Sequence, residues 1–154
     1  MAQPSPIYSV SYQFEVPISA EAERVWQALF DEINDWWIPS FRMVAPDSMV
    51  TFSKQAGGGL TEASDEHGSL LWYTVQWIQH RPWNVYLVGH LGPDWGGPAT
   101  THFRISLEEA DGQTIFKVQD ALTGDVNEKT ATTLKAGWTQ LFTEGLKPYL
   151  EGRG

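Results

Sequence analysis

The chain has 154 residues, of which 42% are hydrophobic and 19% charged, so we expect an ordered single domain over residues 1–154 with its core at about residues 7–150. A formal net charge of −9 disfavours phosphate backbones and anionic membrane surfaces as partners, so we expect neither nucleic-acid binding nor membrane insertion. The absence of cysteine excludes disulfides, thiol nucleophiles and thiolate metal sites.

The N-terminal part predicts one strand followed by a helix. The first residues lack a basic region followed by an apolar run, so we expect no secretory signal and a cytoplasmic location. Residues 7–16 alternate between apolar and polar, which is typical of a half-buried strand, and Pro17 should close it. Ser19 is expected to cap a helix with Glu21 in its first turn. The apolar face of this helix comprises Ala22, Val25, Trp26, Leu29, Phe30 and Ile33.

The middle of the chain predicts a run of six strands. They are expected at residues 49–54, 60–65, 70–79, 84–91, 101–107 and 114–120. Turn signals separate them, among them Asp111-Gly112. Connections of hairpin length imply an antiparallel sheet, and with the flanking helices this gives an α+β fold. Simple alternation would put Trp72 on one face of its strand and Tyr73 with Trp77 on the other.

The C-terminal stretch predicts one long amphipathic helix. Apolar or small residues recur at helical spacing, namely Ala131, Leu134, Trp138, Leu141, Phe142, Gly145 and Tyr149. Asp125 and Glu128 are a candidate capping pair at its start. Roughly 24 residues would span about 36 Å, the breadth of a small domain. A helix held by a curved sheet often leaves a cavity between the two layers, and we expect the functional site there.

A set of landmarks in a fixed order supports a family resemblance. They are Pro17 to Ala20, Val25 to Leu29, Trp36-Trp37, Gly57-Gly58-Gly59, Arg81-Pro82, Asp111 to Thr114, and Gly137-Trp138 through to Leu150. Together they resemble the START-like (SRPBCC, helix-grip) superfamily, in particular the branch named for the activator of the heat-shock-protein-90 ATPase. The resemblance implies a curved seven-stranded antiparallel sheet wrapped around the C-terminal helix, two short helices after the first strand, and a pocket between the layers. Where many relatives have His before the long helix, this chain has Asp120.

The residues expected to line this cavity are mostly aromatic. They are Trp37, Phe52, Trp72, Leu87, His90, Trp95, Phe103, Phe116, Asp120, Trp138 and Phe142. Packing alone is the alternative for the Trp36-Trp37 pair, and core packing is the alternative for the helical pair Trp138 and Phe142. Trp95 lies in a Gly/Pro-rich segment that is either a lid or a plain turn.

Two polar residues are weak candidates for acid/base catalysis. His90 and Asp120 could face the cavity, and Glu62 is a still weaker third candidate. The remaining histidines, His67, His80 and His102, are expected to be solvated. No histidine has metal-ligand spacing, so we expect neither a metal site nor a cofactor. The acidic residues Asp31, Glu32 and Asp35 are best interpreted as a solvated helix end.

These patterns favour a protein that binds a small hydrophobic or aromatic molecule. The alternatives are an enzyme resembling polyketide cyclases or aromatases, with an acid/base residue in the pocket, and a protein-interaction domain resembling chaperone regulators. A homodimer and a chaperone partner remain open as further alternatives.

Overall fold

Residues 2–152 are described by the structure, a computed structural model. Seven strands form one antiparallel sheet in the order β1-β7-β6-β5-β4-β3-β2. Their bounds are β1 Tyr8–Ile18, β2 Met49–Phe52, β3 Gly59–Ser64, β4 Gly68–Gln79, β5 Asn84–Leu91, β6 Ala99–Ala110 and β7 Gln113–Gly124. The predicted α+β class and the seven-stranded antiparallel sheet are confirmed.

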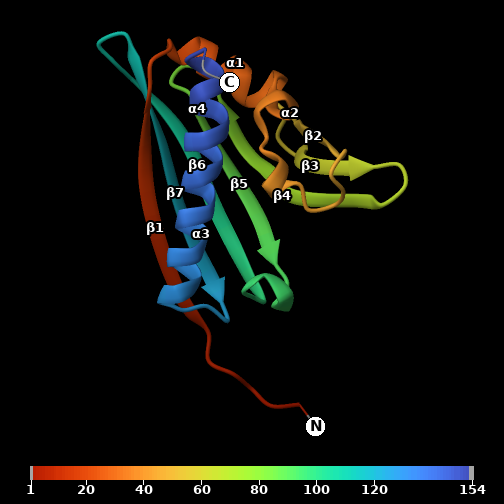
Figure 1. The fold of residues 1–154 in the computed structure, drawn as a ribbon. Coiled ribbons are helices and arrows are strands. Elements are labelled where there is room, and N and C mark those ends of the chain that lie inside the picture. The colour runs from red at the N-terminus through yellow and green to blue at the C-terminus, as the bar shows by residue number, and fades with distance from the viewer. Residues whose placement is uncertain (1, 153–154) are drawn as a thin grey trace.

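The helices cover one face of this sheet. They are α1 Ala22–Asp31, α2 Ile33–Trp36, α3 Glu128–Leu141 and α4 Lys147–Leu150, with short 3-10 turns η1 Pro39–Phe41 and η2 Pro93–Trp95. A π-helical turn, η3 Phe142–Leu146, joins α3 to α4 without a break. Figure 1 shows the C-terminal helix lying along the sheet, with α1 and α2 at the end where the helix finishes. This is the helix-grip arrangement, with two short helices after β1.

The helix starts differ from those predicted. Asn127, not Asp125, is the N-cap of α3: its side-chain oxygen accepts a hydrogen bond from the Thr130 N–H at 3.1 Å, and the Thr130 hydroxyl accepts one from the Asn127 N–H at 3.2 Å. This reciprocal pair satisfies two main-chain donors that a helix start leaves unpaired. Ser19 does not cap α1, whose N-cap is Glu21 with no side-chain cap.

Strand β1 runs through Pro17 to Ile18 instead of ending before the proline. Pro17 lies opposite Ile115 of β7. The strand tolerates a residue without an N–H because β1 is at the edge of the sheet, where one side of the strand has no neighbour to bond.

Two irregularities in β4 overturn the expected alternation. Tyr73 pairs with Leu60 while Leu71 pairs with Thr61, so Trp72 is an extra residue in the ladder. Such a bulge turns consecutive side chains toward one face. Trp72 and Tyr73 therefore both contact Trp138 of α3, with ring centroids 5.8 and 6.0 Å away.

A second register shift lies between Val75 and Trp77. Val75 is buried beneath the helices, whereas Trp77 is 49% exposed on the opposite face. The prediction that Tyr73 and Trp77 share a face is therefore wrong, because an added residue in a strand reverses the alternation beyond it.

The core fills the space beneath α1 and the last turns of the C-terminal helix. Leu141, Leu146 and Phe116 are fully buried there, and Phe142 packs on Phe116 with ring centroids 4.6 Å apart. Gly145 allows the helix to approach closely, because a Cβ at this position would lie 2.5 Å from the carbonyl oxygen of Trp36. The glycine is thus required by backbone contact with α2.

Candidate functional site: an apolar cavity under the first half of the C-terminal helix

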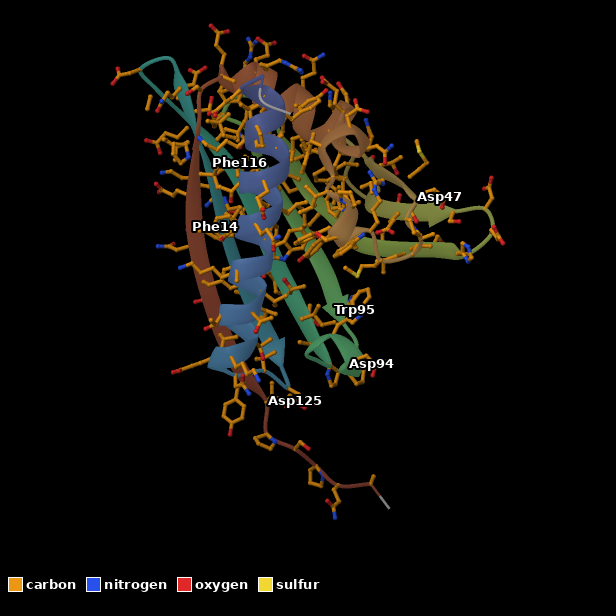
Figure 2. All side chains as sticks on the ribbon, in the orientation of Figure 1. Phe14, Asp47, Asp94, Trp95, Phe116 and Asp125 are labelled. Atoms are coloured by element: carbon orange, nitrogen blue, oxygen red, sulfur yellow. The ribbon has the colours of Figure 1, made fainter. Side chains whose placement is uncertain are left out.

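A cavity of about 390 Å³ lies between α3, the middle of β4, the end of β5, the start of β6 and the η2 turn. This volume is within the range of about 300–1,000 Å³ that is typical of small-molecule pockets. The lining residues are Phe41, Met43, Trp72, Tyr73, His90, Leu91, Trp95, Thr101, Thr133, Leu134, Gly137 and Trp138. Figure 2 shows Trp95 on the turn beyond β5, at the end of the sheet away from α1.

Three indole rings form the main wall of this cavity. Trp95 lies nearly parallel to Trp72, with centroids 6.1 Å apart, and Trp72 meets Trp138 edge to face at 5.8 Å. Trp95 is 45% exposed whereas Trp138 is 6% exposed. The three rings therefore form a continuous aromatic surface from the rim to the floor, where a flat apolar molecule could stack.

Small side chains keep this end of the molecule open. Gly137 faces the cavity, and a Cβ added there would have only the Phe41 ring within 4 Å, at 3.7 Å. Thr101 and Thr133 stand at positions where larger residues would fill the space. Gly89 has a different effect. A Cβ there would lie 2.7 Å from the Tyr73 ring, so only glycine leaves room for this ring in the cavity wall.

The other end of the same interlayer space is filled. The void there measures about 10 Å³, which is at the lower limit for a single water molecule. It is bounded by Leu29, Ile33, Trp36, Trp37, Phe52, Leu60, Tyr73, Leu87, Phe103, Ile105, Trp138 and Phe142. The room for a guest molecule therefore lies at the end lined by the three indoles.

The structure divides the expected lining residues into two groups. Trp72, His90, Trp95 and Trp138 line the cavity. The others lie elsewhere: Trp37, Phe52, Leu87, Phe103 and Phe142 border only the small void, while Phe116 and Asp120 line neither space.

Eight lining residues are not among those predicted from the sequence, namely Phe41, Met43, Tyr73, Leu91, Thr101, Thr133, Leu134 and Gly137. Leu134 had a usable signal, because it lies one turn before Trp138 on the predicted helix. Gly137 had a different one, since a glycine inside a helix is unfavourable and suggests a need for room. Phe41 and Met43 had no such sequence signal, since their place in the cavity wall depends on the path of the segment after α2.

The adjacent residues Trp36 and Trp37 both pack in the interior. They are 4% and 3% exposed. The Trp36 indole N–H donates to the carbonyl of Ala28 at 2.8 Å, and that of Trp37 donates to the carbonyl of Phe41 at 3.1 Å. Trp37 lies behind the cavity wall, 5.5 Å from Trp72 between ring centroids. Its role is to support the wall without lining it.

Asp120 lies on the inner face of β7 and is 3% exposed. Its carboxylate accepts hydrogen bonds from the Thr101 hydroxyl at 2.5 Å and the Tyr12 hydroxyl at 2.7 Å. Burial raises the pKa of Asp120, and the bonds from Thr101 and Tyr12 partly oppose that rise. Burial together with the nearby Asp120 carboxyl also raises the pKa of Tyr12 and of Tyr73, so both phenols keep their protons.

Glu62 is a second buried carboxylate, fully removed from solvent on β3. It accepts a hydrogen bond from the Trp72 indole N–H at 3.1 Å and another from the Val44 main-chain N–H at 2.6 Å. Buried carboxylates need such donors because losing solvation is costly. Glu62 thereby fixes both the Trp72 ring and the segment that carries Met43.

All four histidines have exposed side chains. His90 is exposed at the cavity rim on β5, two strands away from Asp120 in the sheet. His67 and His102 are exposed, as expected. His80 is exposed and accepts a hydrogen bond from the Trp26 indole at 2.9 Å.

A broader hollow of about 880 Å³ lies on the opposite face of the sheet. Side chains on neighbouring strands contact one another across this surface. The Trp77 and Tyr86 rings stack with centroids 5.4 Å apart. The Arg104 guanidinium lies over the Tyr86 ring and donates a hydrogen bond to Asn84 at 2.7 Å. These are cross-strand contacts that stabilise an uncovered sheet face. The smaller cavity has the apolar walls expected of a ligand site, and we assign the site there.

Within residues 2–152, no cluster of three or more His, Cys, Asp or Glu side chains is arranged to hold a metal ion. The acidic residues near the end of α1 are engaged in pairs, with Glu32 bonded to Arg24 at 3.0 Å and Asp31 to Lys54 at 3.0 Å. The described helices include none that is both long and apolar enough to cross a membrane.

Comparison with known proteins identifies the fold through structure. No protein-family model matches the sequence, and no curated protein matches it. Among solved structures, MLL2253 from Mesorhizobium loti is similar with a TM-score of 0.65 at 18% identity, over 94% of this chain and 99% of that one. CV1439 from Chromobacterium violaceum has a TM-score of 0.67 at 16% identity, over 92% and 96% of the two chains.

DynU16, a protein of the dynemicin biosynthetic locus, is similar with a TM-score of 0.67 at 17% identity over 92% of this chain. The chain spans 47% of the length of DynU16. At such identities the likeness shows the fold alone, which is the helix-grip fold. Membership of the START-like superfamily, and of the branch named for the heat-shock-protein-90 activator, remains a prediction.

Proposed function

We propose that this protein binds a small hydrophobic or aromatic molecule in the cavity under α3. The observation that carries the proposal is the open space of about 390 Å³ walled by Trp72, Trp95 and Trp138. Three indoles that face an unfilled space would be solvated at a cost, and an apolar guest would remove that apolar surface from water. The core of the fold does not need this gap, because the neighbouring interlayer space is filled.

A fluorescence titration tests the proposal directly. The neutral probe N-phenyl-1-naphthylamine should bind with a rise in its own emission and quenching of tryptophan emission, because three of the indoles would contact it. Gly137→Leu should abolish this binding by placing a side chain in the cavity. Ala136→Leu is the matched control, since Ala136 is exposed on the same helical turn and outside the cavity wall.

The outcome that contradicts the proposal is equally definite. Unchanged binding in Gly137→Leu would place the probe elsewhere, and a lack of binding across a panel of neutral one- to three-ring aromatic compounds would remove the function altogether.

A cyclase-like enzyme is the second candidate, and one contact favours it. Thr101 lines the cavity and donates to the buried Asp120, so a proton could be exchanged between a bound molecule and this carboxyl group through one hydroxyl. DynU16 belongs to a biosynthetic locus, which agrees with small-molecule chemistry on this fold. The test is incubation with a linear aromatic-forming polyketone: wild type should accelerate its cyclisation, and Asp120→Asn and Thr101→Val should not. The chaperone-regulating role remains a prediction.

A further inference from the structure

The charge distribution around the cavity indicates which ligands it would accept. Of its twelve lining residues, all within the described part of the chain, none is lysine or arginine. The wall presents indole and phenyl faces, which carry partial negative charge. Arg42 lies between the lining residues Phe41 and Met43 in the sequence, and its guanidinium is turned to Asn34 and to the main-chain carbonyl of Trp37, at 2.9 and 3.2 Å. An anionic ligand would therefore lose its hydration without meeting a cation.

A buried carboxylate stands behind the aromatic wall. Glu62 bonds to the indole N–H of Trp72, and its second partner is the main-chain N–H of Val44; both donors are neutral. A carboxylate on the N–H end of an indole increases the negative potential over the ring. In a buried setting this charge is screened little by salt, so it acts on anything stacked against Trp72.

The second carboxylate, Asp120, lies behind Thr101, which lines the cavity. Thr101 has a single hydroxyl proton, which it gives to Asp120. The Thr101 oxygen therefore has only lone pairs left. Since Thr101 lines the cavity, this oxygen is suited to accept a hydrogen bond from a ligand.

We propose that the cavity selects hydrophobic organic cations, such as aryl-alkyl amines and quaternary ammonium compounds, over anions of the same shape. The inference rests on the proposed binding function and specifies its ligand class. Aromatic walls attract ammonium groups through the ring faces. The two buried carboxylates, Glu62 and Asp120, supply the long-range part of the preference, and the formal charge of −9 on the chain acts in the same direction.

Three naphthalene probes of matched shape test the proposal by calorimetry. They are (naphthalen-2-ylmethyl)trimethylammonium, the neutral 2-(methoxymethyl)naphthalene and the anionic 2-naphthylacetate, all measured at pH 8 so that ordinary imidazoles are neutral. The ammonium compound should bind at least about tenfold more tightly than the acetate, equivalent to about 1.4 kcal/mol, with the neutral compound between them. The order should persist at 150 mM salt, because the carboxylates are buried.

Variants separate the sources of the preference. Trp95→Leu should weaken binding of the ammonium compound more than that of the neutral one, because it keeps an apolar side chain and removes a ring face. Asp120→Asn should lower the ratio of cation to anion affinity severalfold while keeping neutral binding. Glu62→Gln should lower the ratio as well, but it loses one of the hydrogen bonds from Trp72 and Val44 and should also weaken neutral binding. Glu109→Gln removes the same formal charge from an exposed position at the far end of β6 and should leave the ratio unchanged.

The results distinguish the two proposals. If the neutral probe binds and the acetate binds as tightly as the ammonium compound, the charge preference is wrong and the binding function stands. If none of the three binds, both proposals fail. A ratio that responds equally to Glu109→Gln and to Asp120→Asn would contradict the role assigned to the buried carboxylates.

Discussion

The two ends of the space between the C-terminal helix and the sheet differ sharply. Beneath η3 the space is filled by interlocking rings, where Phe142 contacts Phe116 at 4.6 Å and Phe14 at 6.4 Å between centroids. Figure 2 shows Phe14 and Phe116 on β1 and β7 beside the helix. Beneath the first turns of α3 the residues that face the sheet are smaller, and a cavity of about 390 Å³ remains.

The comparison shows that one architecture can provide both a packed core and an open cavity. The filled end also lies under α1 and α2, which add large side chains such as Leu29 and Trp36 to the same void boundary. The open end has only the η1 segment and the η2 turn above it, together with Gly137 and Thr133 from the helix. Stability is therefore expected to depend on one end and ligand binding on the other.

Truncation of a ring at the filled end should have the largest effect on stability. Phe142→Ala should lower the free energy of unfolding by about 3–5 kcal/mol, because Phe142 is 2% exposed and its removal leaves a cavity. Thr133→Ala at the open end should change it by no more than about 0.5 kcal/mol. Chemical denaturation measures both. Equal effects would show that the two ends are packed alike.

The two helix glycines should respond in opposite directions to alanine. Gly145→Ala should destabilise the protein by about 1–3 kcal/mol, because the new Cβ would lie 2.5 Å from the Trp36 carbonyl oxygen, which belongs to the backbone. Gly137→Ala should stabilise it by up to about 1 kcal/mol, since alanine is the better helix former and the nearest atom is 3.7 Å away.

Thermal melts of the two glycine variants measure these changes in stability, and titrations with a fluorescent probe sharpen the contrast between them. Gly137→Ala should weaken binding of N-phenyl-1-naphthylamine although the protein becomes more stable, because its methyl group projects into the cavity. A Gly137→Ala variant that is less stable than wild type would argue against open space at this position.

Asp120 should make stability depend on pH. Its pKa in the folded protein lies above the ordinary value of 3.8, so the folded state keeps the proton to higher pH than the unfolded state does. Its contribution to the free energy of unfolding therefore falls as pH rises from 3.8 to the raised pKa, and stays at the lower level above it. The fall amounts to about 1.4 kcal/mol for each pH unit by which the pKa is raised.

Subtraction of the Asp120→Asn variant isolates this effect, since the variant lacks the titrating group. The difference in free energy of unfolding, wild type minus variant, should decline through that window in urea titrations at successive pH values. A difference that rises with pH would mean that the hydrogen bonds from Thr101 and Tyr12 outweigh burial.

The smallest expected effect on stability comes from the rim. Trp95→Ala should change the free energy of unfolding by no more than about 0.5 kcal/mol, because the ring is 45% exposed. The same change should weaken binding of a neutral aromatic probe by about tenfold, since one stacking surface is lost. Parallel thermal melts and fluorescence titrations measure the two quantities. A large loss of stability would instead make Trp95 part of the core.

Periodicity in the sequence was sufficient for the main elements and the α+β class, while the helix-grip arrangement was predicted from the family resemblance. Alternation in residues 7–16 and 101–107 located β1 and β6, and helical spacing from Ala131 to Tyr149 located the C-terminal helix. The Asp111-Gly112 turn was also recognisable, and both residues have positive φ, at 51° and 78°. These signals are local, because a strand or an amphipathic helix must repeat its apolar residues at its own period.

The site was decided by tertiary structure. No local sequence signal marks the bulge that turns Trp72 toward Trp138. The tertiary structure also decides that Phe103 and Phe116 are buried in the core, whereas Thr101 and Gly137 line the cavity. The physical reason is that apolar periodicity specifies which face of an element is buried. Whether a guest molecule or a neighbouring ring covers that face depends on the volumes that distant segments bring together.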